Sequence, residues 1–217
     1  VRVGLHITGY NLAGYATTSC DNILLGATRG SGPLGLYDRG YKLVVQPVAQ
    51  LTTPIGRVAV PLLTRLRVDP GRYKRTYLDM LRVMLLLVTP GVLFAMVMAQ
   101  PLMLFLLGPR WTGVAPVFAW LCLGGLASPL YASTFWLFTT QDRTRRQTAY
   151  VAATSAISVV AFVAGLPWGP NGVAAGAGLS MLLLSTPLIC RGATREGLVA
   201  TADLAIALVP FLIAALA

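Results

Sequence analysis

Charge is scarce in this 217-residue chain: Asp, Glu, Lys and Arg together make up only 11% of the residues, and there is a single histidine. By contrast, 56% of the residues are hydrophobic and the mean hydropathy is +0.71. Such a composition excludes a soluble enzyme and a disordered tail, because neither class contains so much apolar surface. It predicts an integral membrane protein.

Acidic residues are the rarest charged group, with 7 Asp and Glu against 17 Lys and Arg, which gives a formal net charge of +10. In a soluble chain this excess would suggest nucleic acid as a partner. Here most cations lie in short loops between apolar runs, so we expect lipid headgroups or an anionic lipid-linked substrate instead, and no nucleic acid.

Residues that build catalytic and metal sites are also few. The three cysteines, Cys20, Cys122 and Cys190, lie in or beside apolar segments without the spacing of metal ligands. No Ser-His-Asp set, glycine-rich phosphate loop or pair of carboxylates on one helix face is present. We therefore expect neither an enzyme nor a bound metal or cofactor.

Apolar runs of about 20 residues, the length that spans a bilayer, recur along the chain. They predict an all-α, polytopic transmembrane bundle forming a single domain over residues 1–217, with about seven helices near 6–28, 39–62, 78–99, 113–138, 148–166, 171–190 and 199–217. The stretch from Gln100 to Gly108 is shorter than a membrane span. It predicts an interfacial helix that ends at Trp111. The start at Val1 and the end within an apolar run suggest a piece of a longer protein.

Basic residues alternate between the two sets of loops. One set holds ten, at 65, 67, 72, 74, 75, 143, 145, 146, 191 and 195, and the other holds four, at 29, 39, 42 and 110. Because basic loops stay on the cytoplasmic side, residue 1 is predicted to be cytoplasmic.

The first two predicted helices carry polar residues that the others lack. At 100° per residue, the polar positions of the first fall within about a third of its circumference; they include Asn11, Thr18, Asp21 and Asn22. The second helix carries six polar residues at steps of three or four: Arg39, Lys42, Gln46, Gln50, Thr53 and Arg57. We call these six residues the polar stripe.

Two interpretations of the polar stripe remain open. Because polar groups facing lipid are unfavourable, the stripe could line a cavity that admits an anionic, hydroxyl-rich head group, with Pro47 and Pro54 supplying kinks. Alternatively, the amides could bond neighbouring helices, with Arg39 and Lys42 reaching the interface. Arg57 gives the stronger argument for a cavity, because it lies about 10 Å inside the predicted inner boundary, where a charge needs a partner.

Several ordered motifs resemble one family. They are Asp21-Asn22-Ile23-Leu24-Leu25-Gly26, Gly32-Pro33-Leu34-Gly35-Leu36-Tyr37, Pro54-Ile55-Gly56-Arg57-Val58, Pro61-Leu62-Leu63-Thr64-Arg65-Leu66, Pro101-Leu102 with Trp111, and Trp168-Gly169 with Gly172-Val173-Ala174. Together they resemble the C-terminal half of the Wzx/WzxC-type polysaccharide flippases of the multidrug/oligosaccharidyl-lipid/polysaccharide (MOP) superfamily.

That resemblance implies a two-lobed transporter of the bacterial inner membrane, of which this chain is the C-terminal lobe and an N-terminal lobe is missing. It implies alternating-access flipping of undecaprenyl-diphosphate-linked oligosaccharide for exopolysaccharide, capsule or lipopolysaccharide O-antigen synthesis, alongside glycan polymerase and export machinery. Arg57 and Asp21 would lie in or beside the central cavity. Ser19-Cys20 before Asp21 departs from the family pattern and weakens that second assignment.

Other functions are compatible with parts of this pattern. Within the same fold, a multidrug transporter or a peptidoglycan-precursor flippase would also need a polar cavity. A membrane glycan polymerase or ligase should carry a large outer loop, whereas the longest one here is 29–38. A non-transporting scaffold would tolerate neutralisation of the polar stripe.

Overall fold

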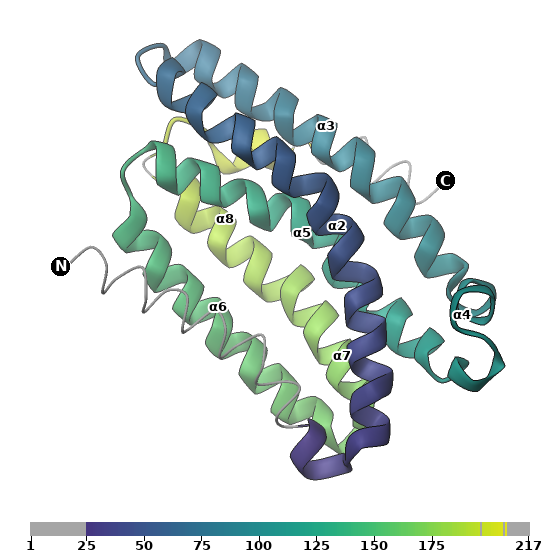
Figure 1. The fold of residues 1–217 in the computed structure, drawn as a ribbon. Coiled ribbons are helices and arrows are strands. Elements are labelled where there is room, and N and C mark those ends of the chain that lie inside the picture. Colours follow the sequence, from purple (N-terminus) through teal and green to yellow (C-terminus); the bar gives the residue numbers. More distant parts are fainter. Residues whose placement is uncertain (1–24, 196, 206, 208–217) are drawn as a thin grey trace.

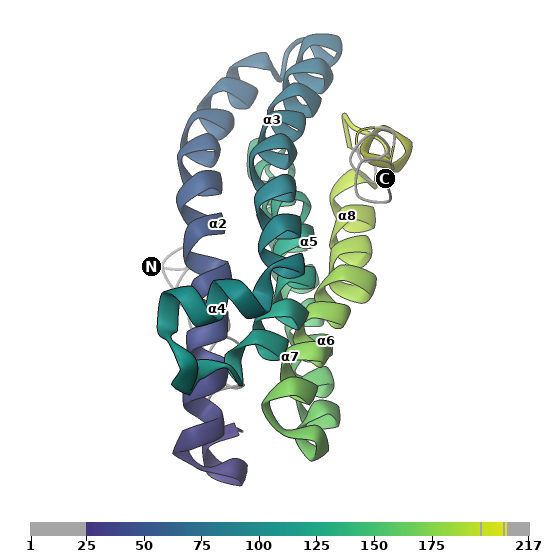
Figure 2. The same ribbon diagram turned by 90° about the vertical axis from the view of Figure 1, so that its right-hand side faces the viewer.

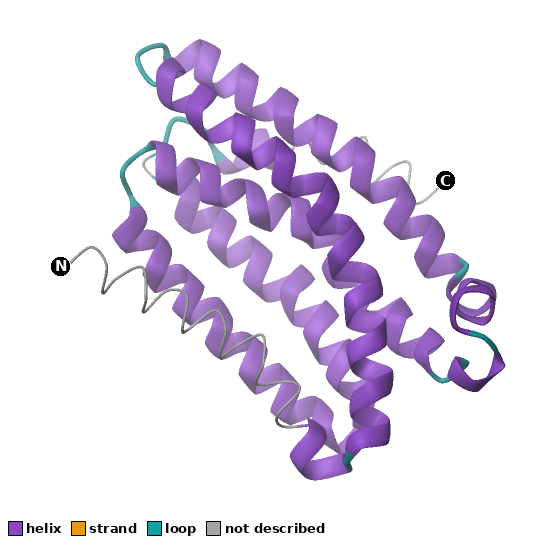
Figure 3. Cartoon of the chain, viewed as in Figure 1, coloured by secondary structure: helices purple, strands orange, loops and turns teal. Residues whose placement is uncertain are grey.

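The computed structural model describes residues 25–195, 197–205 and 207. Helices account for nearly all of this described part and no strand occurs in it, which confirms the all-α prediction (Figure 3). The α-helices are α2 (Ser31–Leu66), α3 (Pro70–Val97), α4 (Ala99–Leu107), α5 (Val114–Thr140), α6 (Thr144–Gly165), α7 (Gly169–Ser180) and α8 (Thr186–Thr194). A π-helical turn, Met181–Ser185, joins α7 to α8.

Local sequence sets where these helices begin and end. The chain turns into α2 at Gly30, whose φ of 84° suits a residue without a side chain. Asp69 caps α3 by accepting a hydrogen bond from the Arg72 N–H at 3.1 Å, with Pro70 at the first helical position. Because this cap lies within the basic loop, α3 begins eight residues before its predicted start at 78.

The helices form a bundle in which α5 is central (Figure 1). The hairpin of α2 and α3 lies on one side, and α6 lies with α7 and α8 on the other (Figure 2). The ribbon of α2 bends along its length, and three prolines, Pro47, Pro54 and Pro61, stand inside this helix (Figure 1). Each proline removes one backbone donor, which accounts for the bend.

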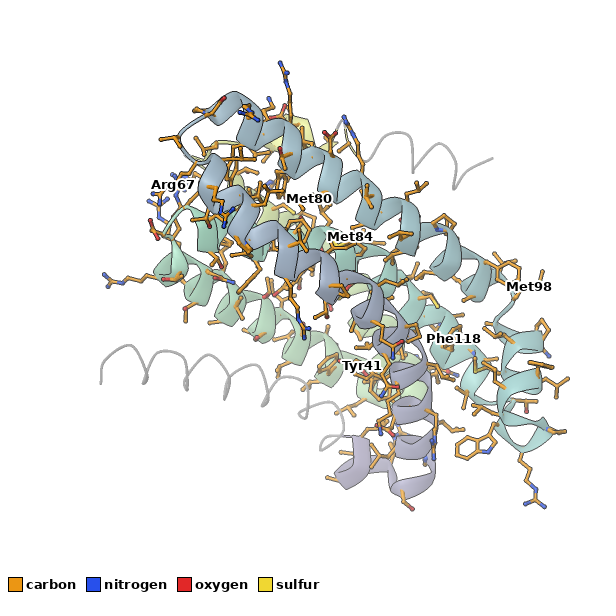
Figure 4. The ribbon with its side chains drawn as sticks, turned by 45° about the horizontal axis from the view of Figure 1, so that its top comes forward. Tyr41, Arg67, Met80, Met84, Met98 and Phe118 are labelled. Atoms are coloured by element: carbon orange, nitrogen blue, oxygen red, sulfur yellow. The ribbon has the colours of Figure 1, made fainter. Side chains whose placement is uncertain are left out.

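Two apolar clusters fill the bundle, one toward each end. The first includes Tyr37, Val44 and Phe118, and Tyr41 packs against it between α2 and α5 (Figure 4). The second contains Met84 and Trp136 and is bordered by hydrogen bonds between α3 and α5. The Tyr77 hydroxyl is hydrogen-bonded to Ser133 Oγ at 2.9 Å, and the Tyr73 hydroxyl to Thr140 Oγ1 at 2.6 Å.

Close contact between α6 and α7 depends on small residues. A Cβ at Gly176 would lie 2.5 Å from the Ala161 carbonyl oxygen, and one at Gly172 would clash with the Gly165 carbonyl oxygen. Ser180, four residues further along, is buried. Gly172 and Gly176 therefore let the two helices pack backbone to backbone, as small residues do between membrane helices.

Three helical stretches are long and apolar enough to cross a membrane: Pro70–Val97, Val114–Thr140 and Thr144–Thr194. The last contains two antiparallel passes, because the chain reverses between α6 and α7 (Figure 1). The 36-residue α2 is not among them. Its polar stripe lowers its hydropathy, which makes α2 the exceptional helix of the bundle.

Candidate functional site

All six residues of the polar stripe lie on one exposed face of α2. The buried residues of the same helix, among them Tyr37, Val44 and Val48, lie on the opposite side and pack toward α5. At 100° per residue, the two sets are separated by roughly half a turn. Packing of α2 against the bundle through its opposite face therefore leaves all six stripe residues exposed.

Exposed apolar residues of α2 lie on the side of the helix that also carries Val44, away from the polar stripe. Leu51, Val58 and Leu62 are exposed and recur at steps of seven and four residues, so they share a face distinct from the polar stripe. A helix face in contact with acyl chains should be apolar, as this one is. We infer that the polar stripe faces something other than lipid.

The end of the stripe that carries Arg39 and Lys42 is held by local contacts. Lys42 Nζ lies 2.7 Å from the Asp38 carboxylate one turn earlier. The Arg39 guanidinium stands 5.7 Å from the centre of the Trp111 ring, in a cation–π arrangement. These contacts position two cations at one end of α2 while leaving both side chains exposed.

The middle and inner parts have no such contacts. Within residues 25–195, the side chains of Gln46, Gln50 and Arg57 make no hydrogen bond or ion pair to the described chain. Arg57 lies nine residues before the end of α2, about 14 Å along the axis. A charge at such depth is unfavourable in lipid by about 2.5–3.5 kcal/mol, so Arg57 needs water, a ligand or another part of the protein.

A polar hollow adjoins the stripe between α2, α5 and α6. Its volume is about 280 Å³, and Thr53 belongs both to the hollow and to the stripe. Gly56 allows the hollow to reach the buried indole of Trp136, because a Cβ there would lie 3.2 Å from the Trp136 Nε1. Thr53 therefore connects the polar stripe to this hollow, whose walls include apolar as well as polar residues.

Three residues of the hollow were missed by the sequence analysis: Tyr131, Thr134 and Gln147. The Tyr131 hydroxyl lies 3.0 Å from Thr154 Oγ1, and Thr134 Oγ1 donates to the Tyr131 carbonyl at 2.6 Å. Tyr131 and Thr134 are three residues apart on an apolar helix, which was an available signal of a shared face. The burial of Gln147 was not evident, because it directly follows a basic loop.

The polar residues predicted on the first helix, Asn11, Thr18, Asp21 and Asn22, lie outside the described residues. The placement of Asp21 in or beside a central cavity therefore remains a prediction. Of the ten predicted site residues, the six on α2 share one face, and Thr53 joins them to the hollow.

The sequence of this chain is also similar to those of known proteins. Residues 1–116 match a family model described as "Polysaccharide biosynthesis protein". The chain is 26% identical over 126 residues to the lipopolysaccharide biosynthesis protein WzxC of Escherichia coli, covering 58% of this chain and 26% of WzxC. It is 23% identical over 168 residues to the amylovoran biosynthesis protein AmsL of Erwinia amylovora, covering 77% of this chain and 43% of AmsL.

A third relative is the teichuronic acid biosynthesis protein TuaB of Bacillus subtilis, 24% identical over 106 residues, which are 49% of this chain and 22% of TuaB. The chain thus spans less than half of the length of each of these curated relatives. No solved structure gives a significant match. Since the family model covers more than half of its residues, this chain belongs to the polysaccharide biosynthesis protein family that the model describes.

Proposed function

We propose that this chain is the C-terminal lobe of a flippase that moves an undecaprenyl-diphosphate-linked oligosaccharide across the bacterial inner membrane. The observation that carries the proposal is the polar stripe: one face of a membrane helix bears amides, a hydroxyl and cations, and all six of these residues are exposed. A second lobe facing α2 would enclose this stripe in a central cavity.

The chemistry of the stripe suits such a substrate. Gln46, Gln50 and Thr53 offer donors and acceptors for sugar hydroxyls near the middle of α2. Arg57 supplies a cation for the diphosphate, as guanidinium groups bind phosphate oxygens with paired hydrogen bonds. Lys42 and Arg39 provide a second cationic region nearer the other end, so an anionic head group meets cations before and after the polar middle.

The direction of movement follows from the distribution of basic residues. The end of the bundle that holds Arg67, Arg143 and Arg195 is the more basic one and is proposed to be cytoplasmic. Arg57 is then the stripe cation nearer the cytoplasm. We expect it to meet the diphosphate first, and the bend of α2 to change as the cavity opens toward the other side.

The test uses the full-length protein in its native cell, with Arg57→Gln and Gln50→Leu compared at matched expression. Loss of a hydrogen bond to a charged group is worth about tenfold or more, so Arg57→Gln should slow flipping by at least about tenfold. The measurement is the fraction of lipid-linked oligosaccharide in the cytoplasmic leaflet, which should rise in both variants.

Arg65→Gln is the matched control, because Arg65 is exposed on the same helix but off the stripe. It should flip normally. If Arg57→Gln and Gln50→Leu also export glycan at the normal rate, the stripe does not line the path. A scaffold without transport activity would then be favoured.

A further inference from the structure

An apolar groove lies on the side of the bundle away from the polar stripe. It is formed by α3, α5 and α8 and is bordered at one end by residues 201–205, with a volume of about 470 Å³. Leu85, Leu93 and Leu130 are among its walls, and α2 contributes no residue to it. We call it the α3/α8 groove.

A single cation stands among the lining residues. Arg191, at the inner end of α8, is exposed, and its guanidinium makes no hydrogen bond or ion pair within the described part of the chain. The nearby Lys74 is already engaged, because its Nζ lies 2.7 Å from the Asp203 carboxylate. The free cation of the groove is therefore Arg191.

The depth of the groove corresponds to one leaflet. From Arg191 to Leu182, another lining residue, the chain runs nine residues through α8 and into the π-helical turn, which is at most about 14 Å because a π-helix rises less per residue than an α-helix. Half of a hydrocarbon core of about 30 Å is about 15 Å. An acyl chain whose phosphate meets Arg191 would therefore extend along the groove to about the bilayer midplane.

One lining residue also has an unmet hydrogen-bonding need. The hydroxyl of Thr186 is buried and has no partner in the described structure, at the point where the π-helical turn ends and α8 begins. Buried hydroxyls almost always have a partner. Thr186 lies five residues, or about 8 Å, deeper than Arg191, where a phosphoglyceride carries its ester carbonyls below the phosphate.

We propose that the α3/α8 groove is a binding site for an anionic phosphoglyceride of the cytoplasmic leaflet, with Arg191 on the phosphate, Thr186 donating to an ester carbonyl and one acyl chain along the groove. Basic pockets between transmembrane helices on the cytoplasmic side bind anionic headgroups in this manner. A prenyl diphosphate has no ester carbonyl for Thr186, and the groove lies apart from the polar stripe. Both facts favour a resident phospholipid over the transported lipid.

The experiment places the full-length protein in nanodiscs of equal parts phosphatidylglycerol and phosphatidylcholine and counts retained lipids by native mass spectrometry. Wild-type protein should retain phosphatidylglycerol selectively. Arg191→Gln should lower that retention about fivefold, which corresponds to one interfacial cation. Thr186→Val should lower it less, and Ala205→Trp, which fills the groove, should abolish it.

Two controls separate the site from general effects on charge and packing. Arg195→Gln removes an exposed cation one turn away that does not line the groove, and Val160→Trp adds an indole to an exposed position of α6. Both should retain lipid as the wild type does, and circular dichroism should show all variants folded. Equal retention in Arg191→Gln and Arg195→Gln would overturn the proposal. So would full retention in Ala205→Trp, or selective retention of the lipid-linked glycan.

Discussion

The contrast between α5 and α2 separates what holds this lobe together from what it offers to a ligand. Buried residues occur on every side of α5, including Val117, Leu121 and Trp136, and this helix contacts α2, α3, α7 and α8. On α2, burial is confined to one face, and the polar stripe occupies the opposite one. A helix inside a bundle can be apolar on all sides. A helix at the border of the bundle needs an apolar face toward the core and other faces whose polarity suits their own surroundings.

This difference predicts which substitutions should lower the stability of the fold and which should alter function alone. Around α5, added or removed atoms disturb close packing, because membrane helices associate chiefly through such contacts. On the polar stripe, Gln46, Gln50 and Arg57 make no hydrogen bond or ion pair within the described chain, so substitutions at these three positions should leave the bundle folded. The following predictions test this division, beginning with the largest effect.

The first prediction concerns the contact between α5 and α7. A Cβ at Gly178 would clash with the Trp120 carbonyl oxygen and would lie 3.3 Å from the Leu123 Cβ. Since backbone on α5 cannot move aside locally, Gly178→Ala should destabilise the protein by about 3 kcal/mol. Unfolding of the full-length protein in mixed micelles, followed by circular dichroism, measures this change.

Gly35→Ala on α2 is the matched control, because no atom lies within 4 Å of the added Cβ. Removing a helical glycine there should be neutral or stabilising by up to about 1 kcal/mol. Equal destabilisation by the two variants would mean that α2 is packed as tightly as α5 in the whole protein, and the division between the helices would fail.

The second prediction concerns a buried hydroxyl pair. Ser133→Ala on α5 leaves the Tyr77 hydroxyl, which is fully buried, without its 2.9 Å partner. An unpaired buried hydroxyl costs about 1–2 kcal/mol. Thr64→Val on α2 also removes a hydroxyl, one that donates to the Val60 carbonyl at 2.8 Å, but Thr64 is exposed and should lose almost nothing. The same unfolding assay compares the two; similar losses would contradict the prediction.

Sequence reasoning identified the helical class and the face of α2 because both follow from periodicity. The spacing of Gln46, Gln50 and Thr53 depends only on helical geometry, which holds before any packing is known. The start of α3 was placed wrongly because the cap formed by Asp69 and Pro70 was counted as part of a basic loop. Loop charge and helix capping compete for the same residues, and here the cap extends the helix into the charged segment.

The polar hollow could not have been found from sequence in the same way. Tyr131 and Gln147 come from different helices, and their approach to Thr53 depends on how α2, α5 and α6 pack. The Gly56 contact with Trp136 depends on that packing as well. Periodicity assigns a residue to a face of its own helix, but only tertiary contacts decide which faces from different helices share a hollow.

The smallest expected effect concerns the link between the inner ends of the two helices. Arg67, just after α2 (Figure 4), pairs with Asp142, just after α5, and both side chains are exposed. Such pairs contribute about 0.5 kcal/mol or less and are screened by salt. Asp142 also has a φ of 57°, a conformation that Asn tolerates and Ala does not. Asp142→Asn should therefore be nearly neutral at all salt concentrations.

Asp142→Ala removes the same charge and adds backbone strain, so it should cost about 1 kcal/mol more than Asp142→Asn, independently of salt. If Asp142→Asn instead costs more than about 1 kcal/mol and the loss shrinks in high salt, the ion pair holds the inner end of α2 in place. The exposed helix would then owe its position to charge as well as to its one packed face, and its contrast with α5 would be one of degree.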